Sequence, residues 1–286
     1  MKTFRITLLS LCLMALAIMS HAQGWRVKDF RSTVKLNTNG SLDISEDITV
    51  QFDESKRGII RKLPYRYYQS NVADGETAEG HNPGQDYLTP IANITVEEKV
   101  YSVTKTNKDY EVKVGQSDVY LSGEQHYRIG YTVYGAINHF SDHGELYWNA
   151  NGNDWDVEFD NLSLTILLPD QRKLKEDDVR CFTGTLGSTF NNAAIKIGPG
   201  KLEFITARRL NVKEGLTAVI RFPKGYVRNE PIPLRVRAEN YVIDSLVEDM
   251  QVLDNGVVSV EEWIYLDLIN PQSDVVRVMD RTYMHW

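Results

Sequence analysis

The fold class of this chain is decided by residues 41–52, which are SLDISEDITVQF. Apolar side chains occupy every second position, except at Glu46, and polar side chains alternate with them. This two-residue period is typical of a β-strand with one buried face. The same period recurs at residues 127–133, 162–168 and 202–204, and no comparable 3.6-residue stripe is present. We therefore expect an all-β protein, an antiparallel β-sandwich of immunoglobulin-like or related type.

An Asn39-Gly40 pair directly precedes this strand. Such a pair supplies the positive φ angles of a type I′ turn, so it predicts a two-residue turn between antiparallel strands. We expect the strands of this hairpin at residues 25–36 and 41–52.

The hairpin sequence recurs near the end of the chain. A shift of 216 residues superposes residues 25–67 on residues 241–283 without a gap, and it places Glu46 on Glu262 and Arg61 on Arg277. We interpret this match as an internal repeat.

The N-terminal segment, the prolines at 231 and 233, and the repeat together predict three parts of the chain. Residues 1–22 are a signal peptide, residues 23–229 are one β-sandwich domain, and residues 230–286 are a linker and the first hairpin of a second, similar domain. A lone hairpin with one apolar face is marginal in water. It must therefore dock on the first domain, exchange with another subunit, or belong to a longer chain, and we favour the longer chain.

Composition excludes one large class of function. The chain has 286 residues, with 32 Lys and Arg against 39 Asp and Glu, and a net charge of -7. This length allows one large domain or two modest ones. The charge leaves no basic field to recruit nucleic acid, so we expect no nucleic-acid partner.

The first 22 residues predict export. Lys2 and Arg5 precede an uncharged apolar run at residues 6–19, and Ser20 and Ala22 are small at the -3 and -1 positions of a cleavage site. The run is too short to span a bilayer, and no later stretch approaches a transmembrane length. We expect a periplasmic, cell-surface or secreted protein, anchored in a membrane only as part of a longer form.

Glu46 falls on the inward face of its strand, where a lone carboxylate is costly. Arg61 is the obvious partner, because the repeat places Arg277 at the same spacing from Glu262. We expect a buried Glu46–Arg61 ion pair that fixes strand register, and a Glu262–Arg277 pair in the second copy.

The densest polar cluster predicts a loop at residues 139–156. Its candidate ligand or metal residues are His139, Asp142, His143, Glu145, Asp154 and Asp156. Their spacing matches no established zinc or calcium frame, so the metal stays open and we expect no cofactor. Glu145 and Asp156 suggest a glycoside hydrolase as an alternative, and a purely structural loop is the remaining interpretation.

Several segments together resemble a known family of predicted membrane proteins, domain of unknown function 2207. The resemblance covers about residues 25–229 and rests on five motifs: residues 39–46, residues 58–64 (GIIRKLP), residues 131–133 (YTV), residues 145–149 (ELYWN) with 152–155, and residues 222–225 (FPKG). It implies an extracytoplasmic β-rich domain behind a signal peptide, usually followed by transmembrane helices, with no established activity. This chain departs from the pattern by starting a second copy where helices are expected.

Together these observations favour a non-catalytic extracytoplasmic module that interacts with an unknown envelope protein or glycan. The alternatives are an envelope glycan hydrolase that uses the carboxylates of residues 139–156, and partner binding or self-association through strand pairing of the C-terminal hairpin.

Overall fold

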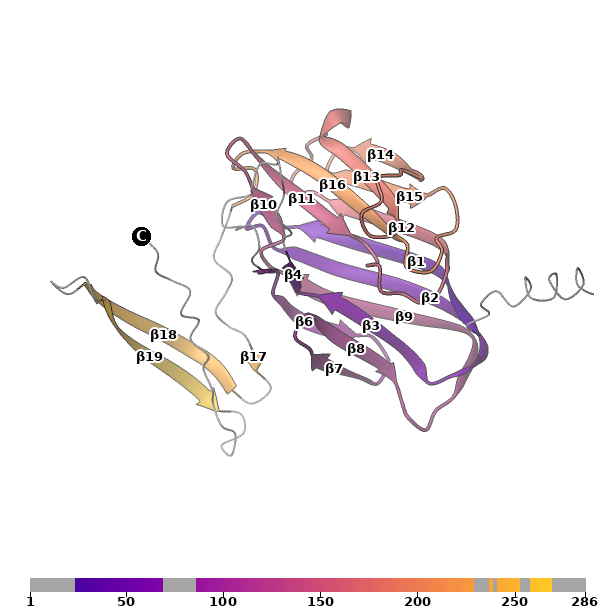
Figure 1. Ribbon diagram of the computed structural model, residues 1–286, viewed down its shortest axis with the longest axis horizontal. Coiled ribbons are helices and arrows are strands. Elements are labelled where there is room, and N and C mark those ends of the chain that lie inside the picture. The colour runs from indigo at the N-terminus through magenta and orange to yellow at the C-terminus, as the bar shows by residue number, and fades with distance from the viewer. Residues whose placement is uncertain (1–23, 69–85, 229–236, 239–240, 253–257, 269–286) are drawn as a thin grey trace, which may run out of the picture. The chain divides into compact units, whose positions relative to one another are not determined.

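The computed structural model describes residues 24–68, 86–228, 237–238, 241–252 and 258–268, and it is built almost entirely of β-strands (Figure 1). The expectation of an all-β, sandwich-like fold is confirmed. Within the described ranges the one helical element is a 3-10 turn at Glu176–Asp178. The chain divides into two compact units, residues 1–230 and 231–286.

A seven-stranded sheet forms one layer of the first unit. Its strands, in spatial order, are β14 (Ala193–Gly198), β15 (Lys201–Thr206), β12 (Phe159–Leu167), β1 (Trp25–Leu36), β2 (Leu42–Lys56), β9 (Leu121–Val133) and β6 (Ile91–Val96). The three stretches in which the two-residue period recurs fall in β9, β12 and β15, with residue 168 just beyond the end of β12, so each of them forms a strand, as predicted.

Two smaller sheets form the opposing layer (Figure 1). One has the order β10 (Ile137–His139), β11 (His143–Asn149), β16 (Gly215–Pro223) and β13 (Val179–Gly184), and the other has the order β3 (Gly58–Pro64), β8 (Asp109–Gly115) and β7 (Tyr101–Lys105). A two-stranded ribbon pairs β4 (Arg66–Tyr68) with β5 (Asp86–Leu88). This divided layer distinguishes the fold from an immunoglobulin sandwich, in which one sheet covers the other.

The core lies between these layers because alternate residues of each strand point inward. In β2 every inward position from Leu42 to Phe52 is buried. The largest fully buried side chains are five phenylalanines with aliphatic neighbours: Phe30, Phe52, Phe159, Phe204 and Phe222. Since residues of all three larger sheets share one cluster, they enclose a single core.

The turn between β1 and β2 differs from the prediction. The hairpin is present, but Gly40 alone has a positive φ angle, of 82°, and its N–H donates to the Asn37 carbonyl at 3.0 Å. The Asn37 N–H donates to the Ser41 carbonyl at 2.9 Å, which makes a longer loop that ends in a left-handed glycine. The two-residue type I′ prediction was wrong because the Asn39 side chain accepts a hydrogen bond from the Ser41 N–H instead.

One strand pair in the seven-stranded sheet is parallel. β1 and β12 run in the same direction, with Val27 opposite Phe159 and Val34 opposite Ile166, whereas the other pairs of this sheet are antiparallel. The sandwich is antiparallel, as predicted, except at this one pair of the sheet. A two-residue period identifies a buried face but carries no information on strand direction.

The second unit contains a three-stranded sheet, β17 (Arg237–Ala238), β18 (Tyr241–Val252) and β19 (Val258–Leu268). Its main hairpin has the same register as the β1–β2 hairpin at the spacing of the sequence repeat: Glu248 lies opposite Glu262 as Ser32 lies opposite Glu46. Both hairpins also have a bulge at the equivalent place, at residues 27–29 and 243–245.

No helix in the described ranges is long and apolar enough to cross a membrane. The predicted signal peptide, residues 1–22, lies outside the described residues.

Candidate binding site

The Glu46 and Arg61 side chains, which we expected to pair, meet at the centre of the fold. Arg61 Nε donates to Glu46 Oε2 at 2.8 Å, and Arg61 Nη2 donates to Oε1 at 2.7 Å. Glu46 is 0% exposed and Arg61 is 4% exposed. Since β2 and β3 belong to different sheets, this bidentate pair connects the two layers of the sandwich.

Three further polar groups complete the pair. The Tyr131 hydroxyl, from β9, donates to Glu46 Oε1 at 2.7 Å, and Arg61 Nη1 donates to the backbone carbonyls of Asn151 and Lys62, both at 2.8 Å. Burial by itself lowers the pKa of Arg61, but the Glu46 carboxylate beside it raises that pKa above its ordinary value. Burial, and then the same carboxylate, raise the pKa of Tyr131 well above its ordinary value. Arg61 is therefore charged and Tyr131 is neutral near neutral pH.

Asn151 extends this network into the four-stranded sheet. Its carbonyl also accepts from Trp155 Nε1 at 2.8 Å, its Nδ2 donates to the Glu214 carbonyl at 3.1 Å, and its Oδ1 accepts from the Leu216 N–H at 3.1 Å. Asn151 is 0% exposed. The network links all three larger sheets and acts as a structural support.

The second predicted ion pair is described only in part. Glu262 lies in β19 at the register position that Glu46 occupies in β2. Arg277 lies outside the described residues, so the Glu262–Arg277 pair stays a prediction.

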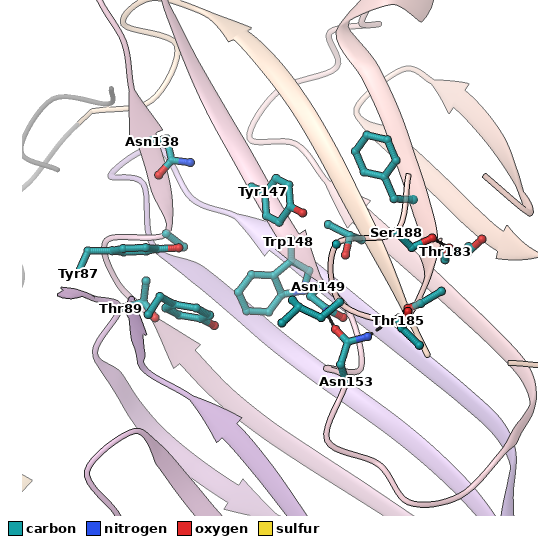
Figure 2. A pocket seen from close by; sticks show the side chains of 18 residues that line it. Tyr87, Thr89, Asn138, Tyr147, Trp148, Asn149, Asn153, Thr183, Thr185 and Ser188 are labelled. Atoms are coloured by element: carbon teal, nitrogen blue, oxygen red, sulfur yellow. Dashed lines mark hydrogen bonds between the residues drawn. The ribbon is translucent and has the colours of Figure 1, made fainter. Parts of the chain in front are cut away.

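A cavity of about 220 Å³ lies on the outer face of the four-stranded sheet (Figure 2). Its floor is a row of outward-facing residues on adjacent strands, Asn149, Thr217 and Phe182, which the sheet register places side by side. The eighteen residues that line it include no Asp, Glu, Lys, Arg or His. In a chain with 25% charged residues, this is an unusually neutral surface.

Aromatic side chains from two separate parts of the chain form one wall of the cavity. The rings of Tyr67 and Tyr87 stack, with centroids 5.2 Å apart and planes at 17°, and Tyr147 of β11 lies near Tyr87 (Figure 2). Burial raises the pKa of Tyr67 to about 12, and burial also raises those of Tyr87 and Tyr147. These phenols are therefore neutral near neutral pH. Although burial affects its pKa, the Tyr147 side chain remains accessible to a ligand, with 55% of its surface exposed.

Two asparagine amides are held in place beside this wall. Asn149 Nδ2 donates to Asn153 Oδ1 at 2.7 Å, and Asn149 Oδ1 accepts from the Gly152 N–H at 2.9 Å. Asn153 Nδ2 donates to the carbonyls of Gly184 at 3.1 Å and Lys213 at 3.0 Å. These bonds fix the orientation of both amide groups, and each keeps spare acceptor or donor capacity.

The predicted loop at residues 139–156 contains a strand. β11 spans His143–Asn149, with Gly144 and Leu146 buried and Tyr147 exposed. The loop prediction was wrong there because the polar residues of this segment lie on the outward face of a strand. Polar side chains on that face stay in contact with water, so a strand accommodates them without a desolvation penalty.

The candidate ligand residues are therefore spread along this strand and beyond it. Asp142 and His143 lie at its start, where the His143 ring stacks on Phe140 with centroids 4.5 Å apart. A hydrogen bond to His143 lowers the pKa of Asp142. Asp154 and Asp156 follow the far end of the strand, which is roughly 20 Å away for seven residues. Within the described ranges, no three or more His, Cys, Asp or Glu side chains are arranged to hold a metal ion.

The two acids of the hydrolase alternative are also apart. Glu145 lies opposite Arg221 and Asn138 in the sheet, whereas Asp156 pairs with Lys213 at 2.8 Å. Glu145 lies within β11, whereas Asp156 lies seven residues beyond the end of that strand and already has a lysine partner. His139 lies in β10 opposite Gly144.

Sequence reasoning missed the cavity. Its Asn149 and Tyr147 belong to a motif that the sequence analysis singled out, but Tyr87, Phe182 and Thr217 come from strands far away in the sequence. One signal in the sequence could have indicated part of it. Residues 144–149 alternate, with Glu145, Tyr147 and Asn149 at every second position, and this alternation predicts a strand with a polar and aromatic outer face.

The fold and the cavity define this chain as an all-β sandwich domain with an uncharged surface site. A family model described as the N-terminal domain of predicted membrane proteins, domain of unknown function 2207, matches residues 26–222. The chain belongs to that family, and the resemblance found in its motifs is confirmed. No curated protein matches the chain significantly.

Three solved structures illustrate its similarity to other proteins. An M1 zinc metallopeptidase from Deinococcus radiodurans is 10% identical with a TM-score of 0.33, over 91% of this chain and 51% of that one. A putative protease from Parabacteroides distasonis is 11% identical with a TM-score of 0.34, over 70% of this chain and 41% of that one. An aminopeptidase N family protein from Idiomarina loihiensis is 10% identical with a TM-score of 0.31, over 82% of this chain and 32% of that one.

The chain thus spans about half the length of the first of these structures.

Proposed function

We propose that this chain is a non-catalytic binding module of the cell envelope, which holds its ligand in the cavity on the outer face of the four-stranded sheet. The observation that carries the proposal is the lack of Asp, Glu, Lys, Arg and His side chains among the eighteen lining residues. A cavity of this kind has aromatic area for contact and fixed amides for orientation, which are the features of a recognition site.

Catalysis needs groups that this cavity does not contain. General acid–base chemistry uses a side chain that titrates near the working pH, and the tyrosines here have pKa values raised by burial. A serine or threonine nucleophile needs an adjacent base, and none lines the cavity.

The experiment is a paired assay of retention and turnover. The mature chain is mixed with insoluble envelope polysaccharide from the producing cell, and the amount that co-sediments is measured together with any soluble product. We expect retention that falls in the Tyr147→Ala variant, with no product released. Release of product that disappears in Glu145→Ala would instead favour the hydrolase alternative.

The proposed location is extracytoplasmic, by export through residues 1–22. Its support is the signal-like composition of these residues and membership in a family of predicted membrane proteins. N-terminal sequencing of the mature protein, from soluble and membrane fractions separately, tests it. We expect Gln23 as the first residue.

We also infer that residues 230–286 open a second copy of the same domain. The support is the shared register of β18–β19 and β1–β2 and the bulge that both hairpins have at the equivalent position. If the hairpin instead serves strand pairing between subunits, the chain should form concentration-dependent dimers that are lost on deletion of residues 241–286. Light scattering across a concentration series distinguishes these two roles.

A further inference from the structure

We propose that the cavity binds one uncharged sugar ring, a neutral hexose unit of an envelope glycan. This inference rests on the proposed function and adds the chemical class of its ligand.

The aromatic wall suits the apolar face of a sugar. A hexose ring presents a patch of C–H groups on its face, and such groups pack against an aromatic ring. Tyr147 projects outward from β11 with 55% of its surface exposed, and Tyr87 lies near it in the same wall (Figure 2). The stacking of half-buried Tyr67 on Tyr87 holds that second ring in place, so the wall exists before the ligand arrives.

The polar groups suit the hydroxyl rim of the same ring. Asn149 and Asn153 are fixed by the hydrogen bonds described above, and each has an oxygen lone pair left over. Within the described part of the chain, no hydrogen bond involves the side chains of Asn138 or Thr217, both of which line the cavity. Amide and hydroxyl groups that both donate and accept match sugar hydroxyls, which also do both.

The neutrality of the cavity selects against charged sugars. A uronic acid, a sialic acid or a phosphorylated sugar would leave an anion desolvated without a cationic partner, and an amino sugar would leave an unpaired cation. The chain's net charge of -7 adds a general repulsion for anions.

The size of the cavity suits a single ring. Its volume of about 220 Å³ is below the range of about 300 Å³ upward that drug-sized ligands occupy. Because the site opens on the outer face of the sheet, the neighbouring units of a longer glycan would remain in solvent.

The chemistry of the lining favours a sugar over an apolar peptide. Leu186 and Phe190, at 87% and 75% exposed, lie in the loop beyond β13, and only Leu186 lines the cavity. Most side chains inside it are phenolic, hydroxyl or amide groups, and an apolar peptide side chain would leave these groups unpaired.

The test is saturation-transfer NMR of the mature chain with simple sugars at millimolar concentration. The neutral probes are the methyl glycosides of glucose, galactose and mannose and free N-acetylglucosamine, and the charged probes are glucuronic acid and glucosamine. The variants are Tyr147→Ala, which removes the stacking ring, and Thr217→Val, which removes one hydroxyl at nearly constant volume. Tyr120→Ala is the matched control, because Tyr120 is 61% exposed and lies outside the cavity.

We expect at least one neutral probe to bind, with binding weakened about tenfold by Tyr147→Ala, less by Thr217→Val and not at all by Tyr120→Ala. We expect no binding of the charged probes. Melting temperatures of the three variants verify that each one folds.

The outcomes separate this inference from the proposed function. Absence of binding by every neutral probe, or preference for glucuronic acid or glucosamine, overturns the inference. If a peptide library yields a ligand that Tyr147→Ala abolishes while the sugars do not bind, the inference fails and the proposed function stands. If a neutral sugar binds and is also cleaved, the ligand class stands and the non-catalytic proposal fails.

Discussion

Replacing Glu46 by glutamine should destabilise the first unit strongly while leaving its shape intact. The Glu46 carboxylate is fully enclosed and accepts three hydrogen bonds, two from Arg61 and one from Tyr131. In the Glu46→Gln variant one oxygen becomes an NH2 group that faces a donor, and the Arg61 charge loses its only buried counter-charge in this network. Breaking a buried pair on one side costs about 3–5 kcal/mol.

This free energy translates into a measurable shift in melting temperature. In a domain of this size each kcal/mol corresponds to roughly 2–4 °C, so we expect a decrease of roughly 6–20 °C. Differential scanning calorimetry measures the shift, and far-UV circular dichroism at low temperature verifies that the variant is folded. Glu124→Gln is the matched control, because Glu124 pairs with Lys28 on an exposed face and its loss should change the melting temperature little.

A Glu46→Gln variant that melts with the parent would refute the view that this pair supports the fold. If Glu46→Gln does not fold at all, Tyr131→Phe keeps the reasoning testable. It removes one hydroxyl donor to the carboxylate and should cost about 1.5–3 kcal/mol, while leaving the ion pair in place.

Three further predictions follow from single positions. Burial raises the pKa of the Cys181 thiol to about 11, so iodoacetamide should modify Cys181 slowly in the folded chain and rapidly in urea, as measured by intact mass. Gly58→Ala should prevent folding, because an added Cβ would lie 1.9 Å from a backbone oxygen of the facing strand. Gly123→Ala is the control, because an added Cβ there has nothing within 4 Å. Only the strain of its positive φ angle should lower the free energy of unfolding in urea, by about 1–2 kcal/mol. Hydrogen bonds from Arg208 lower the pKa of Glu214 in the folded chain below its ordinary value of 4.5. The ionised carboxylate therefore stabilises the fold above pH 4.5, and this stabilisation is lost as the pH falls through the lower folded pKa. We expect the melting temperature of the Glu214→Gln variant to decrease less steeply with falling pH in this range.

Strand faces were predictable from the sequence because burial imposes a two-residue period on each strand separately. The inward position of Glu46 was visible in the same pattern, and the cost of a buried carboxylate made Arg61 a reasonable partner before any geometry was known. The shared register and bulge of the two hairpins support the repeat that we propose from the sequence.

Strand direction and turn type were less predictable because they depend on groups outside the local pattern. The parallel pairing of β1 with β12 joins segments about 130 residues apart, and no local signal distinguishes it from an antiparallel pair. At the first turn, the side chain of Asn39 formed local hydrogen bonds that a dipeptide rule does not consider.

The cavity was the hardest feature to predict because no single segment contains it. Its row of Asn149, Thr217 and Phe182 exists only after three strands pair, and Tyr87 joins from a fourth. Each of these residues alone is ordinary for an exposed strand face, so the site becomes visible only in three dimensions.

The charges on the outer face of the seven-stranded sheet support the cavity as the proposed recognition surface. On the seven-stranded sheet, Arg26 bridges Asp53 and Asp160, and Arg128 bridges Asp47 and Glu97. These charged side chains already form ion pairs and are well hydrated. A ligand that covered them would therefore have to replace both the ion pairs and the bound water. The neutral cavity on the opposite layer presents aromatic area and fixed amides without that cost. A ligand without charge therefore gains most at the cavity, which is why recognition by this domain should be insensitive to salt.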